Sequence, residues 1–581
     1  MEKMVKREKS LLLFGILLVV FFLGLIIAHG AETSGGKVDV DRLLLSTDDN
    51  YTLSVKLWRP KTATAKTPAP GIILVPGGNA SLEYMSSTAL ELARRGYVTM
   101  TIDPYTIGRS EVAPSTPNLG TTYALNYLQA LDYVDATKIG LGGWSAGVGR
   151  VSGAIYNADK TIKNGVQAVL NIGAGAFFAL DVDVNQGTFI GRFDNTYGRG
   201  VDRQVDINTA KAFISVVGKD RVEFGTWYGD IANGKGRVLY SGFTGHILEL
   251  VSKSFISSAC DFFDTALAPG NGVDDFIFGW KELGTILAMA ALIAAIIILC
   301  NLLLKLSFFA PVFNSNEKAV LKADSKSWIM WALFGVSIIF GALITKTAVY
   351  NGQMLLNKTK FLQIANVNGF VFWLICLAAF SVVLLVARML LDKSVDRSAL
   401  KAHLQISSQS LGRTVVLSIA GILFAYFMVS IADQFFTISP RIWKVQMNIL
   451  NPKRFALFLI YLPCYLIPML IINYMQTSSY YIEVNKRLST FLVWAANTLP
   501  ALLFVIYVYG SIFTTGLTPI TNAAMSRANG TMLDAVILMI PISFIAAHFY
   551  RKTKNFYLPA ILNSMLFAWL AVGTDLITYL A

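Results

Sequence analysis

The chain has 581 residues, of which 54% are hydrophobic and 15% are charged, and its formal net charge is +13. Soluble domains contain about 25% charged residues, so this composition excludes a wholly soluble protein. The spacing of the four cysteines fits neither a disulfide framework nor a cysteine-based zinc site.

The N-terminal segment contains a long apolar run, LLLFGILLVVFFLGLIIA, over residues 11–28. A run of this length can cross the hydrocarbon core of a bilayer, which is about 30 Å thick. Ala28 and Gly30 also fit a signal-peptide cleavage site, although the run exceeds the roughly 7–15 apolar residues of a signal peptide. We therefore predict that residues 1–30 are a transmembrane anchor or signal, with the uncleaved anchor favoured.

Residues 31–278 differ from the rest of the chain because they mix polar and apolar residues and are rich in glycine and turn residues. Their length suits one complete α/β domain. Alternating strand-like and helix-like stretches predict a doubly wound, mainly parallel sheet. The strands are expected within 42–60 (a pair), 70–81, 97–102, 135–143, 168–173, 212–218 and 237–243.

The stretch GLGGWSAGVGR, residues 140–150, follows the fifth of these predicted strands and contains the pattern G-x-S-x-G around Ser145. In this pattern the serine occupies a strained turn between a strand and a helix, and small neighbours let the backbone approach closely. By itself the pattern is weak, because a glycine-rich structural turn can look the same. Its order relative to other residues strengthens the interpretation of Ser145 as a nucleophile.

His246 is the candidate general base. It is the one histidine of residues 31–278, and it follows the last predicted strand of that domain. The other three histidines lie in or beside apolar runs. In the α/β-hydrolase arrangement a serine, an acid and a histidine follow one another along the chain, and active groups collect at the carboxyl ends of the strands.

The acid should follow the strand before the histidine. Asp220, just after the predicted strand 212–218, is our candidate. The rivals, all in nearby loops, are Asp181, Asp183, Asp194 and Glu223. The backbone N–H of Ala146 and an N–H of Gly78 or Asn79 are the expected oxyanion-hole donors, because one comes from the residue after the nucleophile and the other from the loop after the third strand.

Residues 37–266 resemble the α/β-hydrolase superfamily, nearest its dienelactone-hydrolase and serine-peptidase-like branches. The resemblance rests on the motifs IILVPGGNA, GYVTMTIDPYTIGRSE, VDATKIGLGGWSAGVG, VVGKDRVE and GFTGHI, which occur in the family's order. It implies an α/β-hydrolase fold and serine hydrolase chemistry for roughly 40% of the chain.

Two residues depart from the pattern of these branches. Pro76 stands where histidine usually precedes the oxyanion glycines, and Trp144 stands where histidine is frequent beside the nucleophile. Because the nucleophile is serine and not the cysteine of dienelactone hydrolases proper, the resemblance implies ester or amide cleavage in preference to lactone opening.

Residues 174–210 form a long insert between two predicted strands. It mixes polar residues with the aromatic side chains Phe177, Phe178, Phe189, Phe193 and Tyr197. In hydrolases such an insert often caps the site and sets specificity. A surface excursion with some packed aromatic residues explains the composition equally well.

Residues 279–581 are expected to form an all-α polytopic membrane domain with about eight transmembrane helices. The apolar runs lie near 284–304, 328–349, 369–387, 414–435, 455–474, 489–512, 531–549 and 556–579. Ionisable residues in membrane spans are often functional, but Asp433, Asp534 and Asp575 lie near predicted span ends, where water could reach them.

The distribution of charge predicts the orientation. With the N-terminus inside, the inner segments hold 18 Lys and Arg and the outer ones hold seven. This is the positive-inside bias, so the basic composition reflects topology and argues against a nucleic-acid partner. It predicts a multi-pass protein of the cell membrane whose N-terminus is cytoplasmic and whose hydrolase-like domain is extracytoplasmic.

The sequence therefore predicts a membrane-bound serine hydrolase, carboxylesterase/lipase-like or peptidase-like, that acts by a Ser–His–Asp acyl-enzyme mechanism. Its expected partners are an ester or amide substrate and the lipid bilayer, with no cofactor and no metal. The alternative is a transporter or sensor whose hydrolase-like domain binds a ligand or partner without catalysis. The natural substrate and the oligomeric state stay open.

Overall fold

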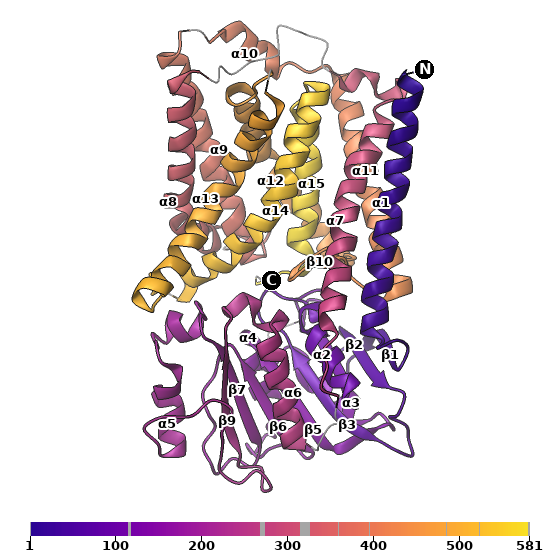
Figure 1. Ribbon diagram of the computed structural model, residues 1–581, viewed down its shortest axis with the longest axis vertical. Coiled ribbons are helices and arrows are strands. Elements are labelled where there is room, and N and C mark those ends of the chain that lie inside the picture. Colours follow the sequence, from indigo (N-terminus) through magenta and orange to yellow (C-terminus); the bar gives the residue numbers. More distant parts are fainter. Residues whose placement is uncertain are drawn as a thin grey trace.

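The computed structural model describes residues 2–113, 118–267, 273–313, 326–357, 359–393, 395–483, 485–521 and 523–578. Within them, the N-terminal part forms a sheet flanked by helices and the C-terminal part is a layer of long helices (Figure 1). The sheet domain lies at one end of the long helices, and the N-terminus lies at their opposite end.

The sheet has nine strands among the described residues, in the order β1-β2-β4-β3-β5-β6-β7-β9-β8. The strands are β1 (Val38–Ser46), β2 (Thr52–Pro60), β3 (Ala69–Val75), β4 (Val98–Asp103), β5 (Val134–Trp144), β6 (Val166–Ile172), β7 (Asn185–Gly191), β8 (Trp227–Tyr228) and β9 (Arg237–Gly242). From β4 through β3, β5, β6 and β7 to β9 all neighbours are parallel, whereas β1, β2 and β8 pair antiparallel. The prediction of a mainly parallel sheet is confirmed.

Helices cover both faces of this sheet. They are α2 (Ser86–Arg94), α3 (Thr121–Gln129), α4 (Ala146–Ala154) and α6 (Lys253–Leu267), with α5 (Lys211–Val217) at one side. Apolar residues of α2 and α6 share one core with the sheet, and those of α3 and α4 share the other. The parallel strands are thus buried on both faces, as doubly wound sheets require.

Two predicted elements were wrong. The stretch 212–218 is not a strand but the helix α5, and the predicted insert 174–210 contains the strand β7. A short apolar run does not distinguish strand from helix by periodicity. The strand β7 begins with the buried polar residues Asn185 and Gln186, so it shows no long apolar run in the sequence. These side chains can be buried because they form hydrogen bonds, among them Gly236 N–H to Asn185 Oδ1 (2.9 Å) and Gln186 Nε2–H to the Ala176 carbonyl (2.9 Å).

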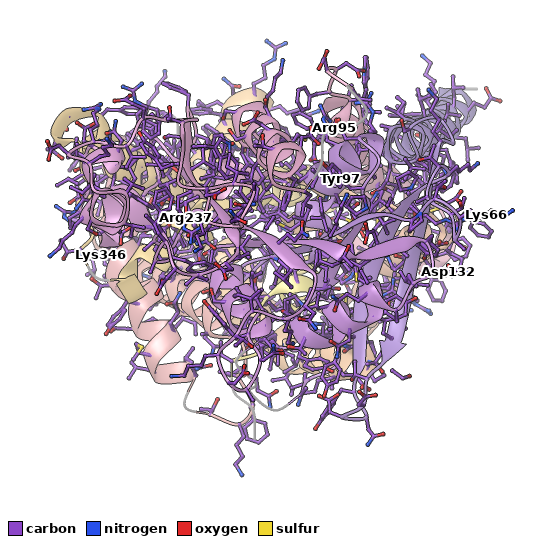
Figure 2. The ribbon with its side chains drawn as sticks, turned by 90° about the horizontal axis from the view of Figure 1, so that it is seen from below. Lys66, Arg95, Tyr97, Asp132, Arg237 and Lys346 are labelled. Carbon is purple, nitrogen blue, oxygen red and sulfur yellow. The ribbon has the colours of Figure 1, made fainter. Side chains whose placement is uncertain are left out.

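Arg237, at the start of β9, organises the loop that precedes β7. Its fully buried guanidinium donates to the backbone carbonyls of Phe178 (3.0 Å), Val184 (2.8 Å) and Ala179 (2.6 Å). Seen from the sheet end of the molecule (Figure 2), Arg237 lies inside the domain, whereas Lys66 points outward at its edge. The arginine thereby fixes the path of the chain into β7.

The helical part has nine helices that are long and apolar enough to cross a membrane, counted over the described residues. They are α1 (Glu2–Glu32), α7 (Phe278–Leu303), α8 (Trp328–Leu356), α9 (Ala365–Leu391), α11 (Ser408–Phe436), α12 (Pro452–Ser479), α13 (Lys486–Thr515), α14 (Ala523–Thr553) and α15 (Tyr557–Thr574). The chain is a membrane protein by this criterion, and each predicted apolar run overlaps one of these helices. The run 284–304 passes the end of α7 by one residue, and the run 556–579 is too long, because α15 begins at Tyr557 and ends at Thr574; residue 579 lies outside the described part.

The first helix packs closely along α7. A Cβ added at Gly24 would lie 2.7 Å from the Gly284 carbonyl oxygen, and one added at Gly284 would lie 2.5 Å from the Gly24 carbonyl oxygen. Small residues allow such close approach between helices in membranes. The helix α1 is therefore an integral part of the helical layer.

Ion pairs join the sheet domain to the helices. Lys56 of β2, fully buried, lies 2.9 Å from Glu32 of α1 and 3.1 Å from Glu83. Asp433 of α11 pairs with Arg42 (3.2 Å) and, in the loop after β4, with Arg109 (2.7 Å). Charges buried in this way are costly unless paired, so the pairs fix the two parts against each other.

Candidate active site

Ser145 lies between the end of β5 and the start of α4, in the turn that the G-x-S-x-G pattern predicts. Its φ is +54° and its ψ is −119°, a strained conformation for a residue with a side chain. A Cβ at Gly143 would lie 2.6 Å from the backbone of Gly147, and one at Gly147 would lie 2.3 Å from the Val75 carbonyl oxygen. The two glycines are therefore required by the tightness of this turn.

His246 follows β9 and begins a short 3-10 helix, His246–Val251. Its Nε2 lies 3.1 Å from Ser145 Oγ. The indole of Trp144 stacks on the imidazole, with ring centroids 5.0 Å apart and an interplanar angle of 26°. The structure thus brings together the serine and the histidine that the sequence singles out, at the carboxyl ends of β5 and β9.

The acid beside the histidine is Asp194 and not Asp220. Asp194 Oδ2 lies 2.9 Å from His246 Nδ1, and its Oδ1 accepts hydrogen bonds from the N–H groups of Thr196 (2.7 Å) and Tyr197 (2.8 Å). Its side chain is fully buried. Asp220 and the other rivals Asp181, Asp183 and Glu223 are exposed loop residues.

The reason for the error is the strand assignment. The acid follows β7, which is the parallel neighbour of β9, and Asp194 comes three residues after the end of β7. The two-residue strand β8 pairs antiparallel with β9 and does not count in this rule. The sequence predicts a strand at 212–218, so the rule selects Asp220 and leaves Asp194 as a rival.

Glu249 is a second carboxyl group at the histidine, and the sequence reasoning missed it. Its Oε2 accepts from Trp144 Nε1–H (3.0 Å) and lies 3.7 Å from His246 Nδ1, while its Oε1 accepts from the N–H of Gly191 (2.8 Å). The only signal in the sequence was its position three residues after the histidine. Glu249 connects the residue before the nucleophile, the end of β7 and the base.

The protonation of these groups follows from burial and charge. Burial alone would lower the pKa of His246, but the Asp194 carboxylate at Nδ1 raises it by more than burial lowers it. The pKa of His246 is therefore above its usual 6.5. Burial, followed by the charge of Asp194, raises the pKa of Glu249 to about 8. Burial thus favours the protonated form of Glu249, whereas Asp194 favours the charged form of His246.

Ligand atoms of Asp194, His246 and Glu249 lie within 4.8 Å of one another, an arrangement that could hold a cation. However, Nδ1 of the histidine is already engaged by Asp194 at hydrogen-bond distance. The expectation that the protein uses no metal and no cofactor stays a prediction.

The loop after β3 lies against the nucleophile. A Cβ at Gly77 would lie 3.1 Å from Cβ of Ser145, whereas one at Gly78 would meet open space. Arg150 of α4, which is buried, donates to the carbonyls of Pro76 (2.7 Å) and Gly77 (3.2 Å). This arginine was not predicted, and it holds the loop against the helix that begins at the nucleophile.

The two candidate sources of oxyanion donors lie on either side of the serine. Ala146 is the first residue of α4, so its N–H has no acceptor within the helix. Gly78 and Asn79 are half-buried in the loop opposite. Their backbone groups stay candidate donors for a substrate oxygen.

The aromatic residues of 174–210 do not form a separate cap. Phe189 is buried in β7, and Phe177 packs on Phe213 with centroids 4.9 Å apart. Tyr197 is the one of the five that borders the base, with its ring 5.5 Å from that of His246. Phe193 packs against Phe513 of α13 (5.2 Å).

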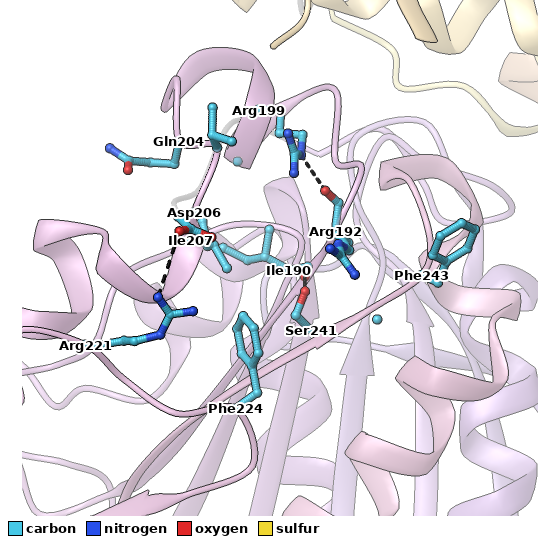
Figure 3. Close-up of a pocket in the computed structure, with 14 residues that line it drawn as sticks. Ile190, Arg192, Arg199, Gln204, Asp206, Ile207, Arg221, Phe224, Ser241 and Phe243 are labelled. Atoms are coloured by element: carbon cyan, nitrogen blue, oxygen red, sulfur yellow. Dashed lines mark hydrogen bonds and ion pairs between the residues drawn. The ribbon is translucent and has the colours of Figure 1, made fainter. Parts of the chain in front are cut away.

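An open cavity of about 550 Å³ lies beside the ends of β7 and β9 (Figure 3). Arg192, Arg199 and Arg221 line it, together with Phe224 and Phe243. Arg199 donates to the Arg192 carbonyl (2.6 Å). Neither Ser145 nor His246 belongs to its lining, so this cavity lies beside the cluster of Ser145, His246 and Asp194 without containing it.

Comparison with known sequences finds a relative that matches part of the chain. No protein-family model matches the chain. Over 137 residues the chain is 31% identical to the Escherichia coli protein called Uncharacterized protein YcjY, a match that spans 22% of this chain and 44% of YcjY. The chain thus spans less than half of that relative.

Solved structures match the sheet domain. Esterase 2 of Thermogutta terrifontis is 16% identical, with a TM-score of 0.29, over 40% of this chain and 96% of the esterase. A Klebsiella pneumoniae protein assigned as a dienelactone hydrolase is 12% identical, with a TM-score of 0.28, over 40% of this chain and 98% of that protein.

Proposed function

We propose that this chain is a membrane-bound serine hydrolase that cleaves an ester or amide bond through an acyl-enzyme, with an α/β-hydrolase fold in its sheet domain. One observation carries the proposal: Ser145 Oγ, both ring nitrogens of His246 and Asp194 Oδ2 form a continuous hydrogen-bonded chain, with distances of 3.1 and 2.9 Å. A hydroxyl, an imidazole and a buried carboxylate in this order are the parts of a nucleophilic triad.

The reaction follows from the positions of these atoms. Ser145 Oγ attacks the carbonyl carbon and its proton passes to His246 Nε2, while Asp194 holds the proton on Nδ1 and stabilises the imidazolium. Collapse of the tetrahedral intermediate breaks the bond to the leaving group, which takes the proton from Nε2. Water then attacks the acyl-enzyme with the same base, which releases the acid and restores the serine.

Charge that develops on the carbonyl oxygen needs N–H donors. We assign the N–H of Ala146 and one from Gly78 or Asn79 to this role, because they belong to the helix start and to the loop on either side of the serine. A single oxyanion donor lowers the activation barrier by about 3–4 kcal/mol.

We also propose that the sheet domain is extracytoplasmic, and that the chain divides into an anchor or signal (1–30), a hydrolase domain (31–278) and a membrane domain (279–581). The charge bias of the loops supports the orientation, and the N-terminus lies at the end of the helices opposite the sheet domain (Figure 1). In a cysteine-free background, Lys66→Cys on the sheet domain should react with an impermeant maleimide in whole cells, whereas Lys401→Cys should react only after lysis. The reverse pattern would contradict the orientation.

Labelling with a fluorophosphonate tests the catalytic proposal, because Oγ forms a bond to phosphorus as fluoride leaves. The wild-type chain in nanodiscs should be labelled, Ser145→Ala should not, and Ser152→Ala on the same helix should be labelled like wild type. A folded wild-type chain that resists labelling would favour the alternative of a ligand-binding domain on a transporter or sensor.

A further inference from the structure

A small cavity lies between the oxyanion loop and the membrane helices. It has a volume of about 70 Å³, several times the roughly 10–15 Å³ that one water requires. Asn79 lines it from the sheet domain, and Lys444, Asp534 and Asp575 line it from the helical part. The cavity therefore begins at the loop that would hold the substrate carbonyl.

The opposite wall of this cavity is apolar and belongs to the membrane helices α9, α12, α14 and α15. Its apolar lining includes Phe370, Tyr465, Leu538, Phe567, Leu570 and Ala571. The cavity is thus amphipathic: polar next to the sheet domain and apolar among the helices.

The polar wall is charge-paired. Lys444 Nζ lies 2.7 Å from Asp534 Oδ2. Burial alone would lower the pKa of Lys444, but Asp534 and Asp575 raise it above its usual range, so the lysine is cationic beside the two acids. Both aspartates line this cavity and are half-buried, and the side chain of Asp534 is 24% exposed, as the sequence-based expectation that water reaches them requires.

The hairpin that carries Lys444 contacts the segment after the oxyanion loop. Lys444 lies at the tip of the hairpin β10 (Arg441–Ile442) and β11 (Val445–Gln446), and Ser81 after the oxyanion loop donates to Gln446 Oε1 (3.0 Å). The hairpin thus joins the polar wall of the cavity to the oxyanion loop.

The membrane helices close over the histidine on the same side. Tyr509 Oη of α13 would lie 2.8 Å from a Cβ added at Gly245, and it donates to Asn195 Oδ1 (3.3 Å). A Cβ added at Gly530 of α14 would lie 3.0 Å from Ile247. The residues next to the base and the acid therefore face the helical part.

Taking the proposed function as a premise, we propose that this cavity is the acyl subsite, and that the substrate is an amphiphile with an apolar acyl chain. The carbonyl would lie over Asn79, the polar atoms next to it would lie against Lys444 and its acids, and the chain would extend among α9, α12, α14 and α15. The membrane half then contributes directly to substrate recognition.

The test compares acyl lengths on the full-length protein in nanodiscs. Wild type should hydrolyse p-nitrophenyl hexanoate with a kcat/KM at least about tenfold above that of the acetate, since each buried methylene adds up to about 1–3 kcal/mol of discrimination. Leu538→Trp, which fills the cavity, should lower hexanoate hydrolysis at least about tenfold more than acetate hydrolysis. Ile540→Trp, on an exposed position of the same helix, should behave like wild type.

Ala571→Met provides a milder filling of the same cavity if Leu538→Trp does not fold, and long- and short-alkyl fluorophosphonates give the same comparison as labelling rates. A labelled wild type without chain-length preference would overturn this inference and leave the proposed function standing. A filling variant that lowers acetate and hexanoate hydrolysis equally, or neither, would also overturn it. Failure of both probes to label Ser145 would overturn the proposed function, and this inference with it.

Discussion

Substitution of Asp194 is the sharpest test of the site geometry. Oδ1 of Asp194 is fixed by two backbone N–H donors, Thr196 and Tyr197, so the side chain cannot rotate freely. In Asp194→Asn the amide oxygen would stay on these donors, and the NH₂ group would face His246 Nδ1. The imidazole would then carry its proton on Nε2, where it cannot accept the proton of Ser145.

The magnitude follows from this tautomer switch. The corresponding change in a serine-protease triad lowers kcat by about 10⁴-fold, and at about 1.36 kcal/mol per tenfold this is roughly 5.4 kcal/mol of transition-state stabilisation. We expect a similar loss here with little change in KM. Asp220→Asn, on an exposed loop, should change kcat less than about twofold.

The assay is steady-state hydrolysis of a short soluble ester by the full-length protein, with thermal unfolding measured in parallel to confirm folding. If Asp194→Asn, correctly folded, kept more than a tenth of the activity while Asp220→Asn lost it, the assignment of Asp194 would be refuted. The sequence-based choice of Asp220 would then be restored.

Three further predictions concern pH, packing and the junction between the two parts. Because the general base must be neutral and the pKa of His246 is raised, kcat/KM should rise with pH through a half-maximum above 6.5, with the activity lost on the acid side. Gly147→Ala would place a Cβ 2.3 Å from the Val75 carbonyl oxygen, so it should lower the free energy of unfolding by about 1–3 kcal/mol and the labelling rate at least tenfold. Lys56→Met removes a buried cation from two carboxylates and should destabilise the protein by about 3–5 kcal/mol, measured by thermal unfolding in detergent.

The two substitutions have matched controls. For the turn it is Gly149→Ala on the same helix, where an added Cβ meets nothing within 4 Å, and the variant should be as stable as wild type or slightly more so. For the junction it is Lys66→Met, because Lys66 is exposed. A kcat/KM that falls as the pH rises through this range would contradict the pH prediction. Equal effects of a variant and its control would contradict the prediction for that variant.

The site illustrates which signals a sequence carries. Ser145 could be found because a strained turn between strand and helix requires small neighbours. Gly143 and Gly147 meet this requirement and lie within two residues of the serine in the sequence. His246 could be found because few histidines compete with it. The sequence alone does not single out Asp194 as the acid, because loop carboxylates are common and only the order of the strands in the sheet selects one of them.

Local sequence determined the long apolar runs that became membrane helices, the paired strands β1 and β2, and the nucleophile turn, because each depends on residues close together in the chain. The tertiary structure decided the rest. β7 is a strand although it begins with the buried polar residues Asn185 and Gln186, since neighbouring strands and loops satisfy their hydrogen bonds. Likewise, Glu249 meets Trp144, and Asn79 meets Lys444 and the helices of the membrane half, only because folding brings together segments separated by a hundred residues or more.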